Sequence, residues 1–518
     1  MIINVLALLP FILIIYFLVI KGVKSYKVMI GVYITTMLLL LYVWQMEFIT
    51  ALFATLRGVL VSLEVFLIII SVLMLFSLLE KRGKLEIIKN FLKKYSSNKH
   101  VQIIIIGWFV VSFFEGIAGF GTPAAITAPL LVFLGFRALT AIVITLVADS
   151  VSVAFGAFGT PVIIGIASSV SSTISIEQIT IITSLLNAVV GLVMPLILLF
   201  LYHVLEKIPL KELKPSILFA LLSGLFFAIP FVLTAVFVGP ELPSVIGAVV
   251  GLIATIFMVS FGVGIERANS TKTPISQILL GVSPYFFLIG LLLITRLDLF
   301  NVSVLINLLR IEFTFLQTGI QSFVFTASSP GVLILLTFVV FSLIYLKTQS
   351  LKKEDITSIF SESFSKVKFV FITLLFTLSF VQLLLNSNIN LSVYDGIPQI
   401  IGAMFSNLGP LYILVAPLIG AFGSFIAGSA TVSNLIFSSL QVEAALSNGI
   451  SQELILALQA SGSAAGNMIA IHNILAVSAL VGVYDKESQI IKINMIIVAI
   501  YCVIISLLGF LLVVGGFI

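Results

Sequence analysis

Two acidic residues, Glu115 and Asp149, stand inside long apolar stretches of this 518-residue chain. A charge at the centre of a bilayer costs about 2.5–3.5 kcal/mol on insertion scales, so acids retained there are candidates for function. Burial favours the neutral form of a carboxyl group, which indicates proton binding. His472 is a third candidate, because imidazole titrates near physiological pH. Each has a structural alternative: backbone N–H groups could satisfy Glu115, Asp149 could cap a helix, and His472 could pack as a neutral ring.

Clusters of glycine and small polar residues accompany these acids. One runs from Glu115 to Pro123 (EGIAGFGTP) and another from Gly423 to Asn434 (GSFIAGSATVSN). Irregular backbone survives at bilayer depth only where protein or a watery cavity satisfies its polar groups. The N-terminal ends of interrupted helices can also hold an anion without a cationic side chain. We therefore expect a site for a small anion, with these substrate-binding candidates: Gly119, Gly121, Thr122, Gly428, Ser429, Thr431, Ser433, Asn434, Gln459 and Asn467.

Two hairpins and two broken helices are expected to position these residues. Residues 101–136 leave a basic loop, which marks the cytoplasmic side, and must return there by Arg137, so they predict a re-entrant hairpin. Residues 398–440 predict a second hairpin, and its acidic flanks indicate entry from outside. Helices at 138–171 and 454–483 follow the hairpins. The first should break at GAFGTP, because proline lacks a donor and crowds the preceding turn.

These segments are related by an internal repeat. Ile117–Thr122 (IAGFGT) aligns with Ile426–Thr431 (IAGSAT), with four identities in six, and Asp149–Gly156 aligns with Gln459–Gly466 at nearly the same offset. Since the hairpins enter from opposite sides, the sequence predicts an inverted-topology repeat, as in many secondary transporters. The repeats would span about 28–265 and 331–518. The alternative is that glycine and alanine recur simply as packing residues of membrane helices.

Composition indicates an all-α polytopic membrane protein. Hydrophobic residues make up 60% of the chain and charged residues only 9%, against about 25% charged in soluble proteins. Residues 1–518 are expected to form one transmembrane unit of roughly twelve helices plus the two hairpins. Basic residues gather in short loops such as Glu80–His100, so they orient the chain with both termini outside and do not indicate a nucleic-acid partner. One cysteine and three histidines give no basis for a disulfide, a metal site or a cofactor.

The first cluster resembles the signature of the lactate permease family. Phe114–Phe136 carries the acid followed by a Gly-Ala-Gly-Phe-Gly-type tip, and looser blocks follow at Ala154–Pro161 and Gly428–Asn434. The resemblance implies a secondary carrier in the cytoplasmic membrane that imports lactate, glycolate or a related 2-hydroxy acid with protons by alternating access. It also implies lipid contact and a homodimer as the expected assembly. Backbone N–H groups and small polar side chains of both tips would meet the carboxylate and the hydroxyl.

Three positions depart from the family pattern as it is usually written. Ala430 stands where an aspartate is usual, Asn467 where a lysine is usual, and Asp149 where an asparagine is usual. Either the proton site has moved to Asp149 or the substrate differs. The alternatives are therefore a Na⁺-coupled carrier of di- or tricarboxylates and a non-transport membrane subunit. No paired catalytic carboxylates and no nucleophile with a base appear, so no enzymatic activity is expected.

Overall fold

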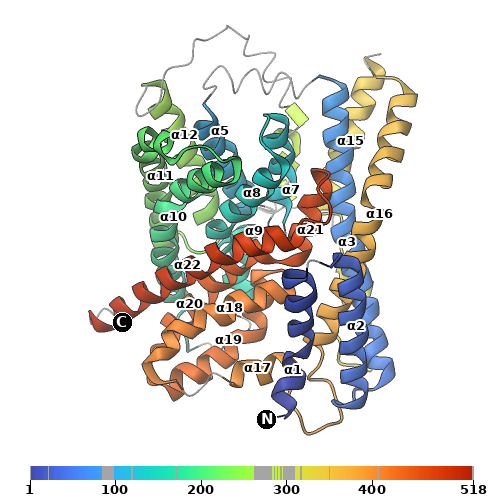
Figure 1. The fold of residues 1–518 in the computed structure, drawn as a ribbon, viewed down its shortest axis with the longest axis vertical. Coiled ribbons are helices and arrows are strands. Elements are labelled where there is room, and N and C mark those ends of the chain that lie inside the picture. Colours follow the sequence, from blue (N-terminus) through green and yellow to red (C-terminus); the bar gives the residue numbers. More distant parts are fainter. Residues whose placement is uncertain are drawn as a thin grey trace.

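The computed structural model is almost wholly helical, as the apolar runs predict (Figure 1). Two short antiparallel strands, β1 (Ile311–Phe313) and β2 (Phe323–Phe325), pair Ile311 with Phe325. The structure describes residues 2–21, 23–83, 98–117, 119, 121–167, 169–170, 173–261, 283–284, 286–288, 290–291, 294–295, 310–315, 318–348, 351–404 and 408–515. Most of the basic loop at Glu80–His100, and the expected end of the first repeat near 265, lie outside them.

Helices long and apolar enough to cross a membrane number eight in the described residues, or nine if one bent pair is a single span. Shorter apolar helices include Ile2–Leu18, Tyr26–Tyr42 and Gly331–Lys347. A span needs about 20 residues, so these shorter helices fall just below the usual length. The polytopic all-α architecture is confirmed, whereas the number twelve stays a prediction.

Four long helices form one flank of the molecule, on the right of Figure 1: α2 (Ser25–Tyr42), α3 (Phe48–Lys81), α15 (Pro330–Lys347) and α16 (Lys353–Leu385). The contacts are reciprocal, because α2 packs on α16, α15 packs on α3, and α3 packs on α16. The first residues of α2 and α15 are separated by the same number of residues as the first residues of α3 and α16.

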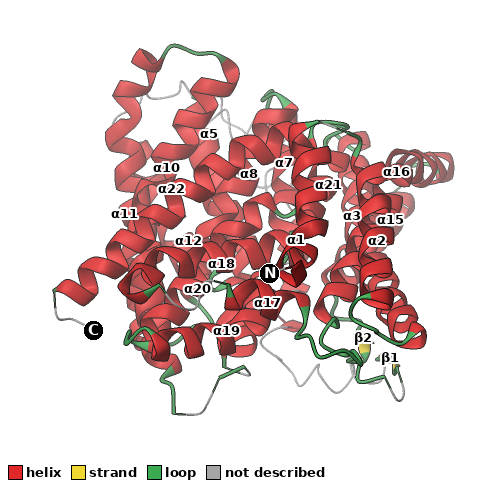
Figure 2. Ribbon diagram, turned by 60° about the horizontal axis from the view of Figure 1, so that its bottom comes forward, coloured by secondary structure: helices red, strands yellow, loops and turns green. Residues whose placement is uncertain are grey.

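A second helical body holds both predicted hairpins and both predicted broken helices (Figure 2). The first hairpin runs along η2 and α6 and returns along α7, and the second runs along α18 and returns along α19. Contacts again cross between the halves: α19 packs on η3 of the first broken helix, and α7 packs on α21 of the second. The first half comprises α5 (Lys99–Gln102), η2 (Ile103–Val110), α6 (Val111–Ile117), α7 (Thr122–Phe133), α8 (Ala138–Val153), α9 (Gly156–Thr160), η3 (Pro161–Ile166) and α10 (Ile176–Glu206).

The second half ends the chain in the same order of elements. It comprises α17 (Ile397–Ala403), η6 (Gly409–Leu411), α18 (Tyr412–Ala427), α19 (Ala430–Ser447), α20 (Gln452–Gly466), η7 (Asn467–Ile469), α21 (Ile471–Leu480) and α22 (Glu487–Val514). The remaining helices are α1 (Ile2–Leu13), η1 (Ile14–Ile20), η4 (Leu210–Ser216), α11 (Ile217–Phe237) and α12 (Pro243–Ser260).

Close approach of backbones holds the flank together. A Cβ added to Gly58 on α3 would collide with the backbone of Ser379 on α16, whereas one added to Gly31 on α2 would meet nothing within 4 Å. Small residues at such crossings let membrane helices approach until their backbones touch. Of these two glycines, only Gly58 is therefore required by packing.

We predict that Gly58→Ala destabilises the protein and Gly31→Ala does not. Overpacking at a filled contact costs about 1–3 kcal/mol, while alanine in an open helical position gains roughly 0.5–1 kcal/mol over glycine. The melting temperature of the detergent-solubilised protein should fall for the first variant alone. Equal melting temperatures for both variants would contradict the contact between α3 and α16.

Candidate functional site

The first broken helix opens between α8 and η3. Ala157, Phe158 and Gly159 have φ of 44°, 57° and 76°, so three successive residues leave the right-handed helix. Pro161 follows, and its missing N–H and fixed φ suit the start of a new helical segment. The break lies within the GAFGTP run, where the sequence predicts it.

The tip of the first hairpin faces this break. Gly119 and Gly121 have φ of +61° and +76°, a region that glycine enters without steric cost. The hydroxyl of Thr122 donates to the carbonyl of Gly119 over 2.7 Å, which closes the turn. Glu115 ends the helical arm before the tip, and its carboxyl group lies so close to Gly156 that a Cβ there would collide with it.

The two predicted acids meet at this place. The side chains of Glu115 and Asp149 are close enough to interact electrostatically, and they are only 3% and 2% exposed. Asn467, from the second half, donates its side-chain amide to Oδ2 of Asp149 over 3.3 Å. The other oxygens, Oε2 of Glu115 and Oδ1 of Asp149, have no hydrogen-bond partner among the described residues. The pair is thus buried, and some of its hydrogen-bonding capacity is unused.

The second broken helix bends by 41° between η7 and α21. Ala470 leaves the helical region with ψ of 122° at the bend. Asn473, one turn into α21, donates to Oδ1 of Asn467 over 3.0 Å. A chain of polar side chains therefore runs from Glu115 through Asp149 and Asn467 to Asn473, linking the two halves of the molecule.

The second tip is built like the first. Gly428 has φ of +67°, and Ser429 caps α19 by accepting from the N–H of Val432. Further along α19, Asn434 donates to the carbonyl of Pro161 over 3.0 Å, so the second hairpin satisfies backbone of the first broken helix.

Hydrogen bonds connect three of the predicted substrate-binding side chains, those of Gln459, Ser433 and Asn434. Gln459 donates to Ser433 over 3.2 Å and to Asn434 over 3.3 Å, and Ser433 donates to the carbonyl of Gly420 over 2.8 Å. Gln459 also accepts from Gln441 over 2.7 Å. These groups join α18, α19 and α20, and their role in binding substrate stays a prediction.

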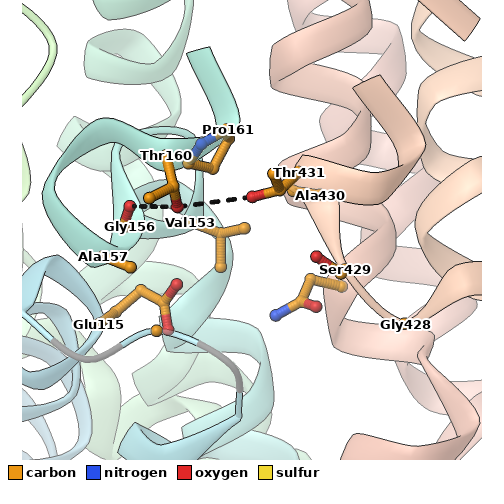
Figure 3. A pocket seen from close by; sticks show the side chains of 12 residues that line it. Glu115, Val153, Gly156, Ala157, Thr160, Pro161, Gly428, Ser429, Ala430 and Thr431 are labelled. Atoms are coloured by element: carbon orange, nitrogen blue, oxygen red, sulfur yellow. Dashed lines mark hydrogen bonds between the residues drawn. The ribbon is translucent and has the colours of Figure 1, made fainter. Parts of the chain in front are cut away.

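A small cavity lies between the two tips (Figure 3). Its volume is about 20 Å³, enough for roughly one water at 10–15 Å³ each. Of the candidates, Glu115, Gly119, Gly428, Ser429, Thr431 and Asn467 line it. Gly121, Thr122, Asp149, Ser433, Asn434, Gln459 and His472 are not among its lining residues.

Thr160 also lines this cavity and was not among the sequence candidates. Its hydroxyl lies 3.5 Å from that of Thr431, which bridges the first break and the second tip (Figure 3). The signal was present in the sequence, because Gly159-Thr-Pro161 repeats the Gly121-Thr-Pro123 of the first tip.

The matches to known proteins extend over nearly the whole chain. Residues 4–514 match the family described as L-lactate permease. A Haemophilus influenzae relative is 31% identical over 454 residues, 83% of each protein. The L-lactate permease of Escherichia coli K12 is 27% identical and Glycolate permease GlcA of the same strain 26%, each over 82% of this chain and 80% of the relative.

Among solved structures, that of Neisseria gonorrhoeae MtrF covers 89% of this chain and 83% of its own. Its TM-score is 0.30 at 17% identity, too low to bear on fold or function. The sequence matches alone carry the assignment: the chain belongs to the L-lactate permease family.

Proposed function

We propose that the protein imports a small monocarboxylate, such as lactate or glycolate, together with a proton across the cell membrane. Membership of a permease family makes the chain a transporter and not an enzyme. The relatives named for L-lactate and for glycolate support the substrate class. The observation that carries proton coupling is the burial of two neighbouring carboxyl groups, Glu115 and Asp149.

Two carboxyl groups that are buried side by side favour a state in which one of them carries a proton. Two like charges in contact cannot both persist in a low-dielectric site, as paired carboxyls in other proteins illustrate. Among the described residues, the side-chain amide of Asn467 donates a hydrogen bond to the carboxyl group of Asp149. The pair therefore holds one proton while it is closed, and it can release that proton when one of the tips opens to water.

Coupling to a proton removes the electrical obstacle to uptake. A bare anion entering a cell works against about 2.3 kcal/mol per 100 mV of membrane potential. A monoanion that moves with one proton carries no net charge. The pH gradient then drives uptake, and the membrane potential neither helps nor opposes it.

The reciprocal contacts of the two halves support alternating access. Each hairpin packs against the broken helix of the other half, which suits an inverted repeat whose halves exchange roles between the two faces of the membrane. In this proposal the hairpins are re-entrant and their tips meet near the bilayer midplane. Opening towards one face of the membrane would separate one hairpin from the broken helix of the other half. The contact between the second hairpin–helix pair would stay closed.

We predict that the purified protein in liposomes accumulates labelled lactate or glycolate when the outside is made acidic. A proton carried with each monoanion makes this uptake sensitive to a protonophore and insensitive to an imposed potential. A sodium gradient at equal pH should drive nothing. If uptake follows sodium at equal pH and favours di- or tricarboxylates, the Na⁺-coupled alternative is correct.

We further predict that Glu115→Gln and Asp149→Asn uncouple uptake from the pH gradient. Each variant removes one of the two carboxyl groups that would share the proton, so the roughly tenfold accumulation that one pH unit can drive through one coupled proton should be lost. Exchange of labelled for unlabelled substrate at equal pH, which needs no net proton movement, should be reduced far less. Glu443→Gln, an exposed acid on α19, is the control and should retain pH-driven uptake. Full pH dependence in both site variants would refute the assignment.

A further inference from the structure

A second cavity lies beside the second tip, on the side facing the four-helix flank. Its volume is about 360 Å³, within the roughly 300–1,000 Å³ of typical ligand pockets, whereas the cavity beside Glu115 has about 20 Å³. Its walls come from α3, α16, the segment before α15 and the tip at Gly428 and Ser429. Of the two cavities, only this one has room for a small organic acid.

Two helix N-termini border this second cavity. Ser329 is the N-cap of α15 and Ser429 the N-cap of α19, and both line the wall. Helix N-termini attract anions through their free N–H groups and the helix dipole. Ser429 already accepts from Val432, whereas the Ser329 hydroxyl makes no capping bond.

The Ser329 hydroxyl is a buried polar group that a ligand in this cavity could satisfy. The residue is 4% exposed, and its Oγ has no hydrogen-bond partner in the ranges that the structure describes. A buried hydroxyl without a partner costs roughly 1–3 kcal/mol, so a ligand that accepts its proton would relieve this penalty. Ser342, further along α15, has the same burial and likewise lacks a partner among the described residues, but it does not line the cavity.

Other charged and polar side chains that line the cavity would select the ligand. Gln382 lines the cavity and accepts a hydrogen bond from Arg57, whose Nε has no partner among the described residues. Glu64 and His472 line it too. A ligand with one carboxylate can turn it towards the helix N-termini and away from Glu64. A second carboxylate at the far end of the ligand would approach the acid.

The wall between the two cavities is a short piece of backbone. Gly428 and Ser429 line both, and the ring of His472 lies so close to Gly428 that no Cβ would fit. A ligand in the larger cavity therefore touches the same tip that closes over Glu115.

We propose that this second cavity is the carboxylate-binding chamber, and that the small cavity between the tips serves the proton alone. The proposal rests on the function proposed above and adds where the substrate sits. The carboxylate accepts from the Ser329 hydroxyl at the N-termini of α15 and α19, and the 2-hydroxyl group faces Gln382. The chamber takes monocarboxylates and rejects dicarboxylates of similar length.

Transport by Ser329→Ala and its matched control Ser342→Ala tests the chamber. Loss of one hydrogen bond to substrate should raise KM for lactate roughly 2- to 12-fold with little change in kcat. Ser342→Ala should keep the KM of the unmodified protein. Equal KM values for all three proteins would overturn the assignment of Ser329.

Cysteine labelling tests occupancy without relying on transport. Cys502 is the only cysteine in the sequence and is 1% exposed, so Ser329→Cys introduces one reactive site in the full-length protein. Lactate and glycolate should slow its reaction with a small methanethiosulfonate reagent, and malate should not. Labelling unaffected by any monocarboxylate overturns the chamber, and so does equal protection by malate.

The two proposals fail in different ways. If the unmodified protein takes up neither lactate nor glycolate, the proposed function is wrong, yet protection of Ser329→Cys by another monocarboxylate would still support the chamber. If uptake is driven by the pH gradient but Ser329→Cys is never protected, the function stands and the substrate binds elsewhere.

Discussion

Backbone at the first broken helix receives a polar partner from a distant segment of the chain. In lipid, no water is available to satisfy an open N–H or C=O group. The hydrogen bond from Asn434 to the carbonyl of Pro161 is the central example, because one half of the chain supplies the donor and the other half the broken helix. Movement of the second hairpin away from the first broken helix would therefore expose the carbonyl of Pro161. Because backbone at the break is satisfied by the opposite hairpin, the polar site can be rearranged when that hairpin moves.

Features encoded by local sequence were predictable. The tips fall at glycines with positive φ, Gly119 and Gly428, and the first helix breaks just before Pro161, since glycine and proline restrict or release backbone dihedrals wherever they stand. Features assembled from distant segments were not. Ser329 belongs to no motif, and it gains interest only because α15 begins beside α3 and the second tip. His472 was grouped with the acids because imidazole titrates near physiological pH, and the structure places it on the wall of the larger cavity.

The three departures from the family pattern converge in space. Asn467 donates to Asp149, and Ala430 and Asn467 both line the small cavity. Where the pattern that the first hairpin resembles has an aspartate, a lysine and an asparagine, this chain has an alanine, an asparagine and an aspartate. The usual set adds one negative and one positive charge beside Glu115. This set adds one negative charge, which the single proton of the proposed pair would neutralise, so both arrangements would leave the same net charge at the junction.

Coupling requires that proton and substrate cannot move separately, and the tip at Gly428 and Ser429 offers a physical reason. It is the common wall of the cavity beside Glu115 and of the larger chamber. An anion in the chamber draws the N-terminus of α19 towards itself through the helix dipole. Withdrawal of the tip from Glu115 would expose a pair that, without its proton, holds two adjacent negative charges. In the proposed mechanism, closure over both cavities is therefore favourable only when the anion and the proton are bound together.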